Sequence, residues 1–187
     1  MMMTDVRSGF AALALAASVF FAGAAPAMAQ TPPGVLIVGQ IAEPQSLDPH
    51  RVTAANDFRI LTNVYDGLVR YEAGTLDLEP ALATAWDISE DGLTYTFTLR
   101  EGVTFHDGSA FDAQAVKFNF DRMLDEAHPF HNTGPFPLSF QFDAVDNVTV
   151  IDPLTVEFTL KEPFAPFLSN LAAPVGLIVS PAGVEAA

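Results

Sequence analysis

The stretch Leu93-Thr94-Tyr95-Thr96-Phe97-Thr98-Leu99 decides the fold class of this chain. Leucine, tyrosine and phenylalanine alternate with three threonines, so an extended backbone places the apolar side chains on one face and the hydroxyls on the other. That alternation is typical of a half-buried strand in an antiparallel sheet. Asp91-Gly92 before the stretch and Asp107-Gly108 after it favour tight turns at its two ends.

Two more strands are predicted further along the chain. Residues 148–151 form a short β-branched run, and residues 155–160 alternate Val156, Phe158 and Leu160 with polar side chains. The dipeptide Asp152-Pro153 separates the two runs and is typical of a turn. We therefore expect these segments to join the antiparallel sheet.

Helical spacing follows Asp112, which is a good N-cap residue. Val116, Phe120, Met123 and Leu124 would share one side of a helix that begins there. The spacing therefore predicts an amphipathic helix packed on the sheet.

A second helix is predicted from Asn56 through Phe58, Leu61 and Leu68. Its N-cap would be Asn56 or Asp57, and Gly67 is a plausible stop. Together with the predicted sheet, the two helices indicate a mixed α/β (α+β) fold.

Both ends of the core-forming sequence carry short apolar runs. Val35–Gln40 resembles a buried strand, and a shorter strand is expected at Gly176–Val179. Prolines 163 and 166 open a short helical segment that ends near Leu171.

Ser180-Pro181 is a helix-start signal, yet the sequence stops six residues after Pro181. We therefore expect a truncated chain, with a flexible tail as the alternative.

The first 29 residues have the three parts of a secretory signal peptide. Arg7 precedes an apolar stretch from Phe10 to Ala25, and the small residues Ala27 and Ala29 mark a cleavage site before Gln30. The apolar stretch is interrupted by Gly23 and Pro26, so a membrane-spanning anchor is the weaker alternative.

The composition excludes several classes of partner and chemistry. Eight basic residues stand against 23 acidic ones, giving a net charge of -15, which repels nucleic acid and anionic membrane surfaces. The chain has no cysteine and therefore no disulfide, zinc-thiolate site or lipid-bearing cysteine. With 16 phenylalanines and half its residues hydrophobic, the chain is expected to form a packed core. A soluble periplasmic protein is the expectation.

Motifs of enzyme chemistry are absent from the sequence. We find no nucleophile elbow, zinc-binding helix or phosphate-cradling loop, so the prediction is a protein that is not an enzyme and needs no cofactor. Pro129 between His128 and His131 disfavours a metal site, and a surface loop is expected there. His106 is interpreted as a hydrogen-bonding structural residue. Trp86 and Arg100 are interpreted as a core anchor and a member of a sheet-edge ion pair, with a peptide-stacking tryptophan and a carboxylate-binding arginine as the alternative.

The segment Trp86–Gly108 closely resembles the signature of the extracellular solute-binding family 5. That family includes periplasmic oligopeptide-, dipeptide-, glutathione- and nickel-binding proteins of ABC importers. Supporting matches are Ser46-Leu47-Asp48-Pro49-His50, Tyr65-Asp66-Gly67-Leu68 and Thr155-Val156-Glu157-Phe158-Thr159-Leu160. The resemblance covers nearly all of residues 35–181.

The resemblance implies a periplasmic binding protein-like II fold with two lobes around a hinge. Residues 30–44 would then hold the first strand of lobe one, residues 45–171 an inserted α+β domain with the antiparallel sheet, and residues 172–187 the return to lobe one. Members of the family are much longer than this chain. Without the second lobe a cleft has one wall, so we expect the chain alone to bind no peptide with useful affinity.

The function implied by the resemblance is the substrate-binding component of an ABC importer. It would capture peptides or peptide-like solutes in the periplasm and deliver them to a membrane permease. The alternatives are another solute, such as a nickel chelate, an opine or a sugar, or a secreted hydrolase.

The same resemblance places the loop after Leu-Asp-Pro-His at the ligand cleft. This points to Val52, Thr53, Ala54 and Ala55 as substrate-binding residues. Small side chains allow another backbone to approach, and main-chain groups can pair with an extended peptide. An ordinary connector into the next helix is the alternative.

Overall fold

The computed structural model describes residues 33–187. The predicted signal peptide lies outside the described residues and stays a prediction. Residues 33–39 belong to a separate unit and form neither helix nor strand, whereas Gln40–Ala187 form a compact unit. Within residues 33–187, no helix is long and apolar enough to span a membrane.

The strand predicted over Val35–Gln40 is not formed in the structure. Leu36 and Ile37 are 86% and 72% exposed. A strand is stable only when its backbone groups pair with a neighbour, and the strand pairs of the described residues all lie at or after Val69. No strand is therefore formed within residues 33–44, where the first strand of lobe one was expected, and the division into lobes stays a prediction.

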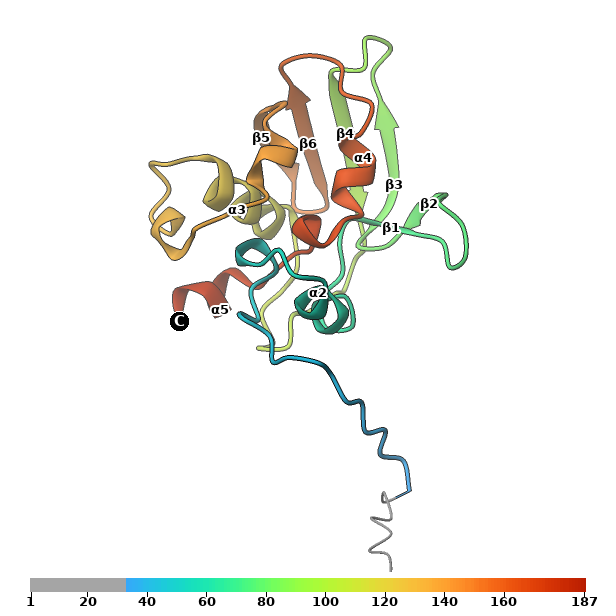
Figure 1. Ribbon diagram of the computed structural model, residues 1–187. Coiled ribbons are helices and arrows are strands. Elements are labelled where there is room, and N and C mark those ends of the chain that lie inside the picture. Colours follow the sequence, from blue (N-terminus) through green and yellow to red (C-terminus); the bar gives the residue numbers. More distant parts are fainter. Residues whose placement is uncertain (1–32) are drawn as a thin grey trace, which may run out of the picture. The chain divides into compact units, whose positions relative to one another are not determined.

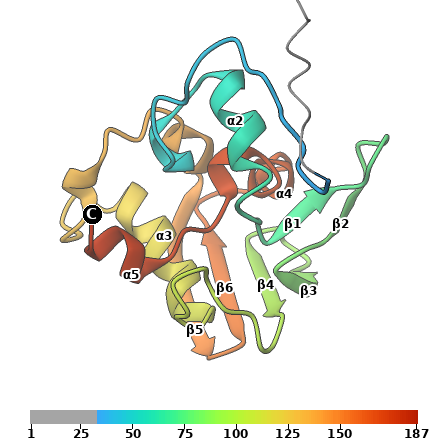
Figure 2. The ribbon, with the colours of Figure 1, turned by 90° about the horizontal axis from the view of Figure 1, so that it is seen from below.

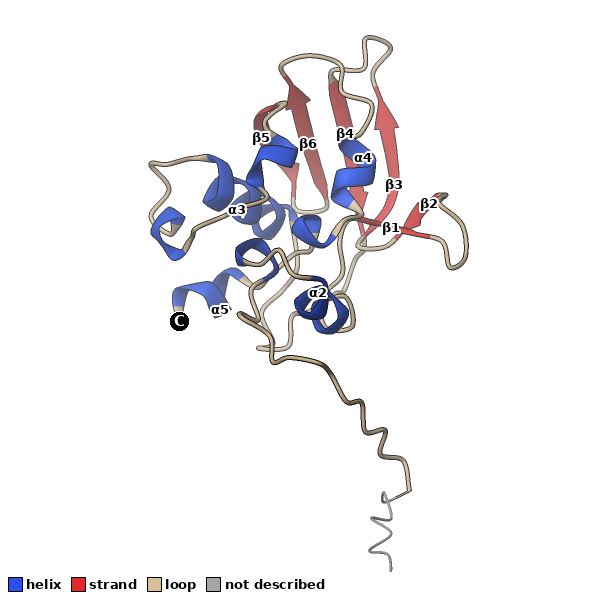
Figure 3. Cartoon of the chain, viewed as in Figure 1, coloured by secondary structure: helices blue, strands red, loops and turns tan. Residues whose placement is uncertain are grey.

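The core of the unit is a four-stranded antiparallel sheet, coloured red in Figure 3. Its strand order is β3-β4-β6-β5, with β3 at Ala83–Ile88, β4 at Thr94–Leu99, β5 at Val145–Asp152 and β6 at Thr155–Leu160. The predicted antiparallel sheet is confirmed. Strand β5 begins three residues before the predicted start.

The alternation along β4 has the predicted consequence. Tyr95, Phe97 and Leu99 are buried, whereas Thr98 is exposed on the opposite face. The turn before the strand uses Gly92 with φ +70°, a conformation that favours glycine.

Two helices cover the apolar face of the sheet, as Figure 2 shows. Helix α3 spans Ala113–Leu124, and α4 spans Phe167–Leu171. The Asp112 side chain accepts a hydrogen bond of 2.9 Å from the Ala115 backbone N–H, so the predicted N-cap is confirmed. Phe158 of β6 lies among aromatic rings from both helices, which ties the two layers together.

Helix α2 is shorter than predicted, because it ends at Leu61 rather than near Gly67. It spans Ala55–Leu61, and neither Asn56 nor Asp57 caps it. The buried Asp57 carboxylate instead accepts a 3.0 Å hydrogen bond from the Gln45 backbone N–H. Asp57 therefore forms a hydrogen bond with a residue distant in sequence instead of capping its own helix.

A small two-stranded sheet follows helix α2, with β1 at Val69–Tyr71 and β2 at Leu78–Pro80.

The segment after α4 contains no strand at Gly176–Val179, contrary to prediction. A 3₁₀ turn, η4, occupies Pro174–Gly176, and a single bridge pairs Gly67 with Leu177. The predicted helix start is confirmed, because Ser180 caps α5 at Pro181–Glu185. Three more 3₁₀ turns are η1 at Pro49–Arg51, η2 at His131–Thr133 and η3 at Ser139–Phe142. Figure 1 shows the helices and strands in chain order.

Candidate functional site

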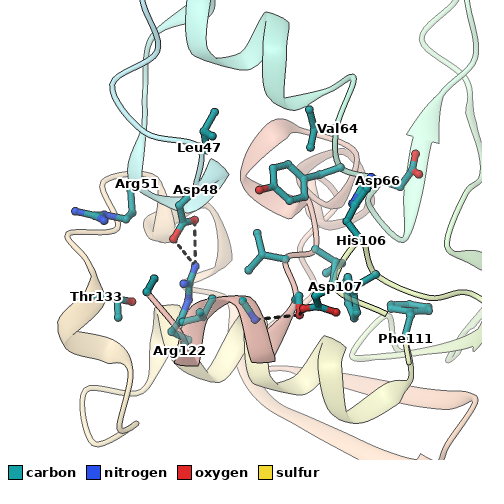
Figure 4. A pocket seen from close by; sticks show the side chains of 18 of the residues that line it. Leu47, Asp48, Arg51, Val64, Asp66, His106, Asp107, Phe111, Arg122 and Thr133 are labelled. Carbon is teal, nitrogen blue, oxygen red and sulfur yellow. Dashed lines mark hydrogen bonds and ion pairs between the residues drawn. The ribbon is translucent and has the colours of Figure 1, made fainter. Parts of the chain in front are cut away.

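An open cavity of about 820 Å³ lies beside helix α3 within the unit Gln40–Ala187. Figure 4 shows it from close by. The segments that line it include the loop around η1, the segment after α2, the turn after β4, helix α3, the loop around η2 and the segment leading into α5. Its lining residues include Ser46, Leu47, Asp48, Arg51, Val64, Tyr65, Asp66, His106, Asp107, Phe111, Arg122 and Ser180.

The rim of the cavity has an apolar part. Leu47 and Val64 are 61% and 43% exposed although they are large hydrophobic residues, and both line the cavity. Phe111 adds a buried ring to the wall. Apolar walls combined with polar groups are typical of a site for a small solute.

The loop Ser46–Arg51, here called the cavity loop, is ordered by Asp48. Its carboxylate accepts a 2.9 Å hydrogen bond from the His50 backbone N–H, which caps the turn η1. Its own N–H donates to the Ser46 hydroxyl at 3.0 Å. This short-range bonding is characteristic of Asp before a turn, and it sets the direction of Arg51.

Arg122 of α3 is the largest fully buried side chain of the described residues. Its Nη2 atom donates a hydrogen bond to Oδ1 of Asp48 at 3.1 Å and forms an ion pair with Oδ2 of the same carboxylate at 3.0 Å. The guanidinium lies 5.2 Å from the ring centre of Phe136, a cation–π distance. A charge taken out of water in this way is tolerated only when it is paired and hydrogen-bonded. Arg122 therefore joins the cavity loop to the helix beneath it.

His50 completes the buried contact. Its Nε2 lies 2.8 Å from the Leu177 carbonyl oxygen and its Nδ1 lies 2.6 Å from Nη2 of Arg122. Burial lowers the pKa of His50 to about 4; the Arg122 charge also lowers it, whereas Asp48 and the hydrogen bond to Leu177 raise it. His50 is therefore neutral at pH 7.

The opposite wall of the cavity is held by hydroxyl groups. Ser180 and Ser109 both donate to the Asp107 carboxylate. These hydrogen bonds lower the pKa of Asp107. Because the Ser180 hydroxyl also accepts from the Gly183 backbone N–H, it serves as the cap of α5.

The segment before α5 is fixed to α3 by Asn119. The buried Asn119 amide accepts from the Val179 N–H at 3.0 Å and donates to the Val179 carbonyl at 2.9 Å. The side chain thus pairs with Val179 as a neighbouring strand would. Val179, which lines the cavity, is therefore placed by this pairing rather than by the predicted strand.

One tyrosine at the cavity is affected by its surroundings. Partial burial raises the pKa of Tyr65, and the negative charge of Asp48 raises it further. Tyr65 therefore presents a neutral hydroxyl, able to donate or accept a hydrogen bond, at the cavity.

The predicted ligand residues do not line this cavity, although Arg51 immediately before them does. Val52 is buried in a small cluster with Leu61 and Leu177. Thr53 and Ala55 are exposed, and Ala54 is half-buried. The assignment of these four residues to the ligand stays a prediction.

Other side chains singled out in the sequence have structural surroundings. Trp86 packs against the core, with its ring 6.5 Å from that of Phe97. Arg100 donates to the Ala81 carbonyl and forms no ion pair with any residue of 33–187, so the predicted ion pair is wrong for the described part of the chain. His106 is exposed and, within residues 33–187, makes no side-chain hydrogen bond, contrary to expectation.

The loop with His128 and His131 packs locally. The His128 ring lies edge-on to Phe118, and His131 Nδ1 lies 2.9 Å from the Arg122 carbonyl oxygen. The part of the chain that the structure describes holds no cluster of three or more potential metal ligands.

Arg122 was not singled out from the sequence. In the sequence, Arg122 stands out only because it is a charged residue next to the predicted apolar side of the helix. That side includes Phe120 and Met123. Spacing along a helix tells which residues share a face, but it does not reveal a distant partner such as Asp48.

Comparison with known proteins identifies the family. A family model described as "Bacterial extracellular solute-binding proteins, family 5 Middle" matches residues 77–186. The chain belongs to this family. The resemblance found in the sequence is confirmed.

Individual relatives agree with this assignment. The chain is 40% identical over 174 residues to di/tripeptide-binding protein 2 of Pseudomonas aeruginosa, covering 87% of this chain and 33% of that protein. It is 41% identical over 139 residues to a glutathione-binding protein of Pectobacterium atrosepticum, covering 74% and 26% respectively. The chain thus spans about a third or less of the length of these relatives.

A solved structure shares the fold. The periplasmic binding protein DppA of Helicobacter pylori, in complex with the peptide STSA, matches with a TM-score of 0.67 and 36% identity. The match covers 78% of this chain and 30% of the other. The predicted fold class, a mixed fold of the periplasmic binding protein type, is confirmed.

Proposed function

We propose that this chain is part of the substrate-binding component of an ABC importer for peptides or peptide-like solutes. The observation that carries the proposal is the 40% identity to a di/tripeptide-binding protein over 87% of the chain. An open cavity with apolar and polar walls is consistent with it. The protein would bind its solute in the periplasm and deliver it to a membrane permease.

The proposed location and partner rest on two observations. The family consists of extracellular proteins, and the Helicobacter relative is described as a periplasmic protein associated with an ABC transporter. The predicted signal peptide agrees with export. The permease is proposed as partner because an importer needs a membrane channel for the captured solute.

Binding rather than catalysis is proposed as the activity. The relatives described above are named for what they bind. The hydroxyl of Ser180 at the cavity is used to cap α5 and to bond Asp107, so it is not arranged as a nucleophile beside a base.

The test is a thermal-shift screen of the full-length gene product that carries this chain. Di- to pentapeptides, sugars, an opine and nickel chelates are compared at equal concentration. A peptide present at 100 times its Kd is expected to add about 2.7 kcal/mol to the free energy of unfolding. Stabilisation by a sugar, opine or chelate alone would contradict the peptide proposal, and turnover of a peptide without ATP would favour a hydrolase.

We further propose that Val52, Thr53, Ala54 and Ala55 contact the ligand. Val52 (φ -121°, ψ 158°) and Ala54 (φ -89°, ψ 140°) are extended, and an extended backbone can pair with a peptide as an added strand. The segment follows Arg51, which lines the cavity.

Replacing Ala55 by tryptophan in the full-length gene product tests this loop. We expect peptide affinity to fall at least tenfold, or about 1.4 kcal/mol, because the bulky ring blocks approach of a second backbone. The free energy of unfolding should hardly change, since Ala55 is exposed. Isothermal calorimetry measures the affinity.

The matched control is Ala73→Trp, which places the same ring on the exposed turn between β1 and β2. It should leave affinity unaltered. Equal affinity of the Ala55→Trp variant and the unmodified protein would remove this loop from the ligand site.

A further inference from the structure

The cavity loop is held from two distant parts of the chain. Asp48 bonds Arg122, which lies 74 positions away in sequence, and His50 contacts the Leu177 carbonyl, 127 positions away. His50 and Arg122 are both 1% exposed. The loop that contributes Leu47 and Arg51 to the cavity therefore depends on a buried polar contact at its base.

Only one protonation state of His50 satisfies both of its ring contacts. The Leu177 carbonyl can only accept, so Nε2 must carry the proton. The Arg122 guanidinium can only donate, so Nδ1 must offer its lone pair. The structure thus assigns the neutral Nε2–H tautomer to His50.

We infer that His50 and Arg122 form a proton-sensitive clamp that positions the cavity loop. A proton taken up from solvent would bind at Nδ1 of His50. The hydrogen bond from Arg122 Nη2 is then lost, and two N–H groups and two positive charges face each other at 2.6 Å. The loop is released, while the sheet, which does not include these groups, stays folded.

The charged groups around His50 act in opposite directions. Asp48 in its own turn lies 3.8 Å from Nδ1 and favours the protonated ring. The positive charge of Arg122 on α3 disfavours the protonated ring. Burial between η1 and η4 disfavours it as well; Leu177, whose carbonyl contacts the ring, is the residue that ends η4. Burial is the largest of these effects, so the neutral ring is favoured.

The sign of the pH dependence follows from that balance. The pKa of His50 is about 4 with the loop closed and about 6.5 when the side chain is free in water. Loop closure is therefore fully favoured above pH 6.5, weakens as the pH falls toward 4, and levels off below pH 4. The two values imply a total loss of roughly 300-fold in the closing equilibrium, about 100-fold of it between pH 7 and pH 4.

Amide hydrogen exchange of the full chain, followed by NMR without ligand between pH 4 and 7, tests the clamp. We expect the protection factors of the His50 and Arg51 amides to fall roughly 100-fold across this range. The amides of β4 and β6 should keep their protection. Because no ligand is present, the result is independent of whether the protein binds peptides.

Two variants separate the clamp from general acid effects. His50→Gln keeps a donor toward Leu177 but cannot take up a proton, so its loop protection should be lower and independent of pH. His106→Gln, at an exposed histidine of the same cavity, should behave like the unmodified protein. A pH dependence that persists in His50→Gln would overturn the clamp.

A second readout covers the case that His50→Gln does not fold. The ring carbon protons of His50 in the unmodified protein report its titration directly. A midpoint near 4, the pH at which the fall in loop protection levels off, supports the inference. A midpoint near 6.5, or a loop protection that does not fall between pH 6.5 and the midpoint of the ring titration, refutes it.

Discussion

Replacing Arg122 by methionine should lower the free energy of unfolding by about 3 kcal/mol. Methionine fills much of the same space, so the loss comes from the polar contacts. Asp48, only 19% exposed, is left without its cation, and His50 Nδ1 is left without a donor. Urea unfolding followed by circular dichroism measures the change, and the midpoint of thermal unfolding should fall by roughly 6–12 °C.

An exposed ion pair supplies the control. Arg70 donates to Glu79 at 2.7 Å, with side chains 61% and 37% exposed. Arg70→Met should therefore cost less than about 1 kcal/mol. Similar losses in the two variants would mean that the buried pair contributes no more than a surface one.

A double variant tests the cause of the loss. Removing both partners, with Asp48→Asn added to Arg122→Met, leaves no unpaired charge at the base of the cavity loop. The double variant should therefore lose less than the sum of the two single losses. Simple additivity would instead indicate that the two side chains act independently.

Replacing Phe158 by alanine should lower the free energy of unfolding by about 4 kcal/mol. Phe158 is fully buried, and its ring centre lies 5.6 Å from that of Phe97, 4.8 Å from that of Phe120 and 5.4 Å from that of Phe167. The deletion leaves a cavity where β4, α3 and α4 meet, and neighbouring rings can fill it only in part. Urea unfolding measures the loss.

Phe140→Ala removes the same group from a residue that is 61% exposed. Its cost should be below about 0.5 kcal/mol. A loss for Phe158→Ala as small as that for Phe140→Ala would show that the central aromatic cluster does not hold the two layers together.

Local sequence patterns predicted the elements whose causes are local. The alternation along Leu93–Leu99 gave β4 its buried and exposed faces, and Asp112 and Ser180 cap the helices that follow them. In each case the interacting groups lie within a few residues of each other. The family, too, was recognisable, because its signature is a run of turns and alternating residues.

Elements with distant partners were predicted less well. The run Val35–Gln40 has strand-like composition but forms no strand, and Gly176–Val179 pairs with the Asn119 side chain and with Gly67 instead of joining a sheet. Asp57 was expected to cap a helix and instead bonds Gln45. Composition indicates which segments can be extended or helical, but the available partner decides the outcome.

The sequence by itself determined the mixed antiparallel fold and the family of this protein, because both rest on patterns repeated along neighbouring residues. The tertiary structure alone decided the candidate site. It brings Asp48, His50, Arg122 and Leu177 within hydrogen-bond distance across up to 127 positions of sequence. The contacts with Leu177 and Arg122 then select one tautomer of His50. Burial keeps that ring neutral, since a charge is costly where no solvent can surround it.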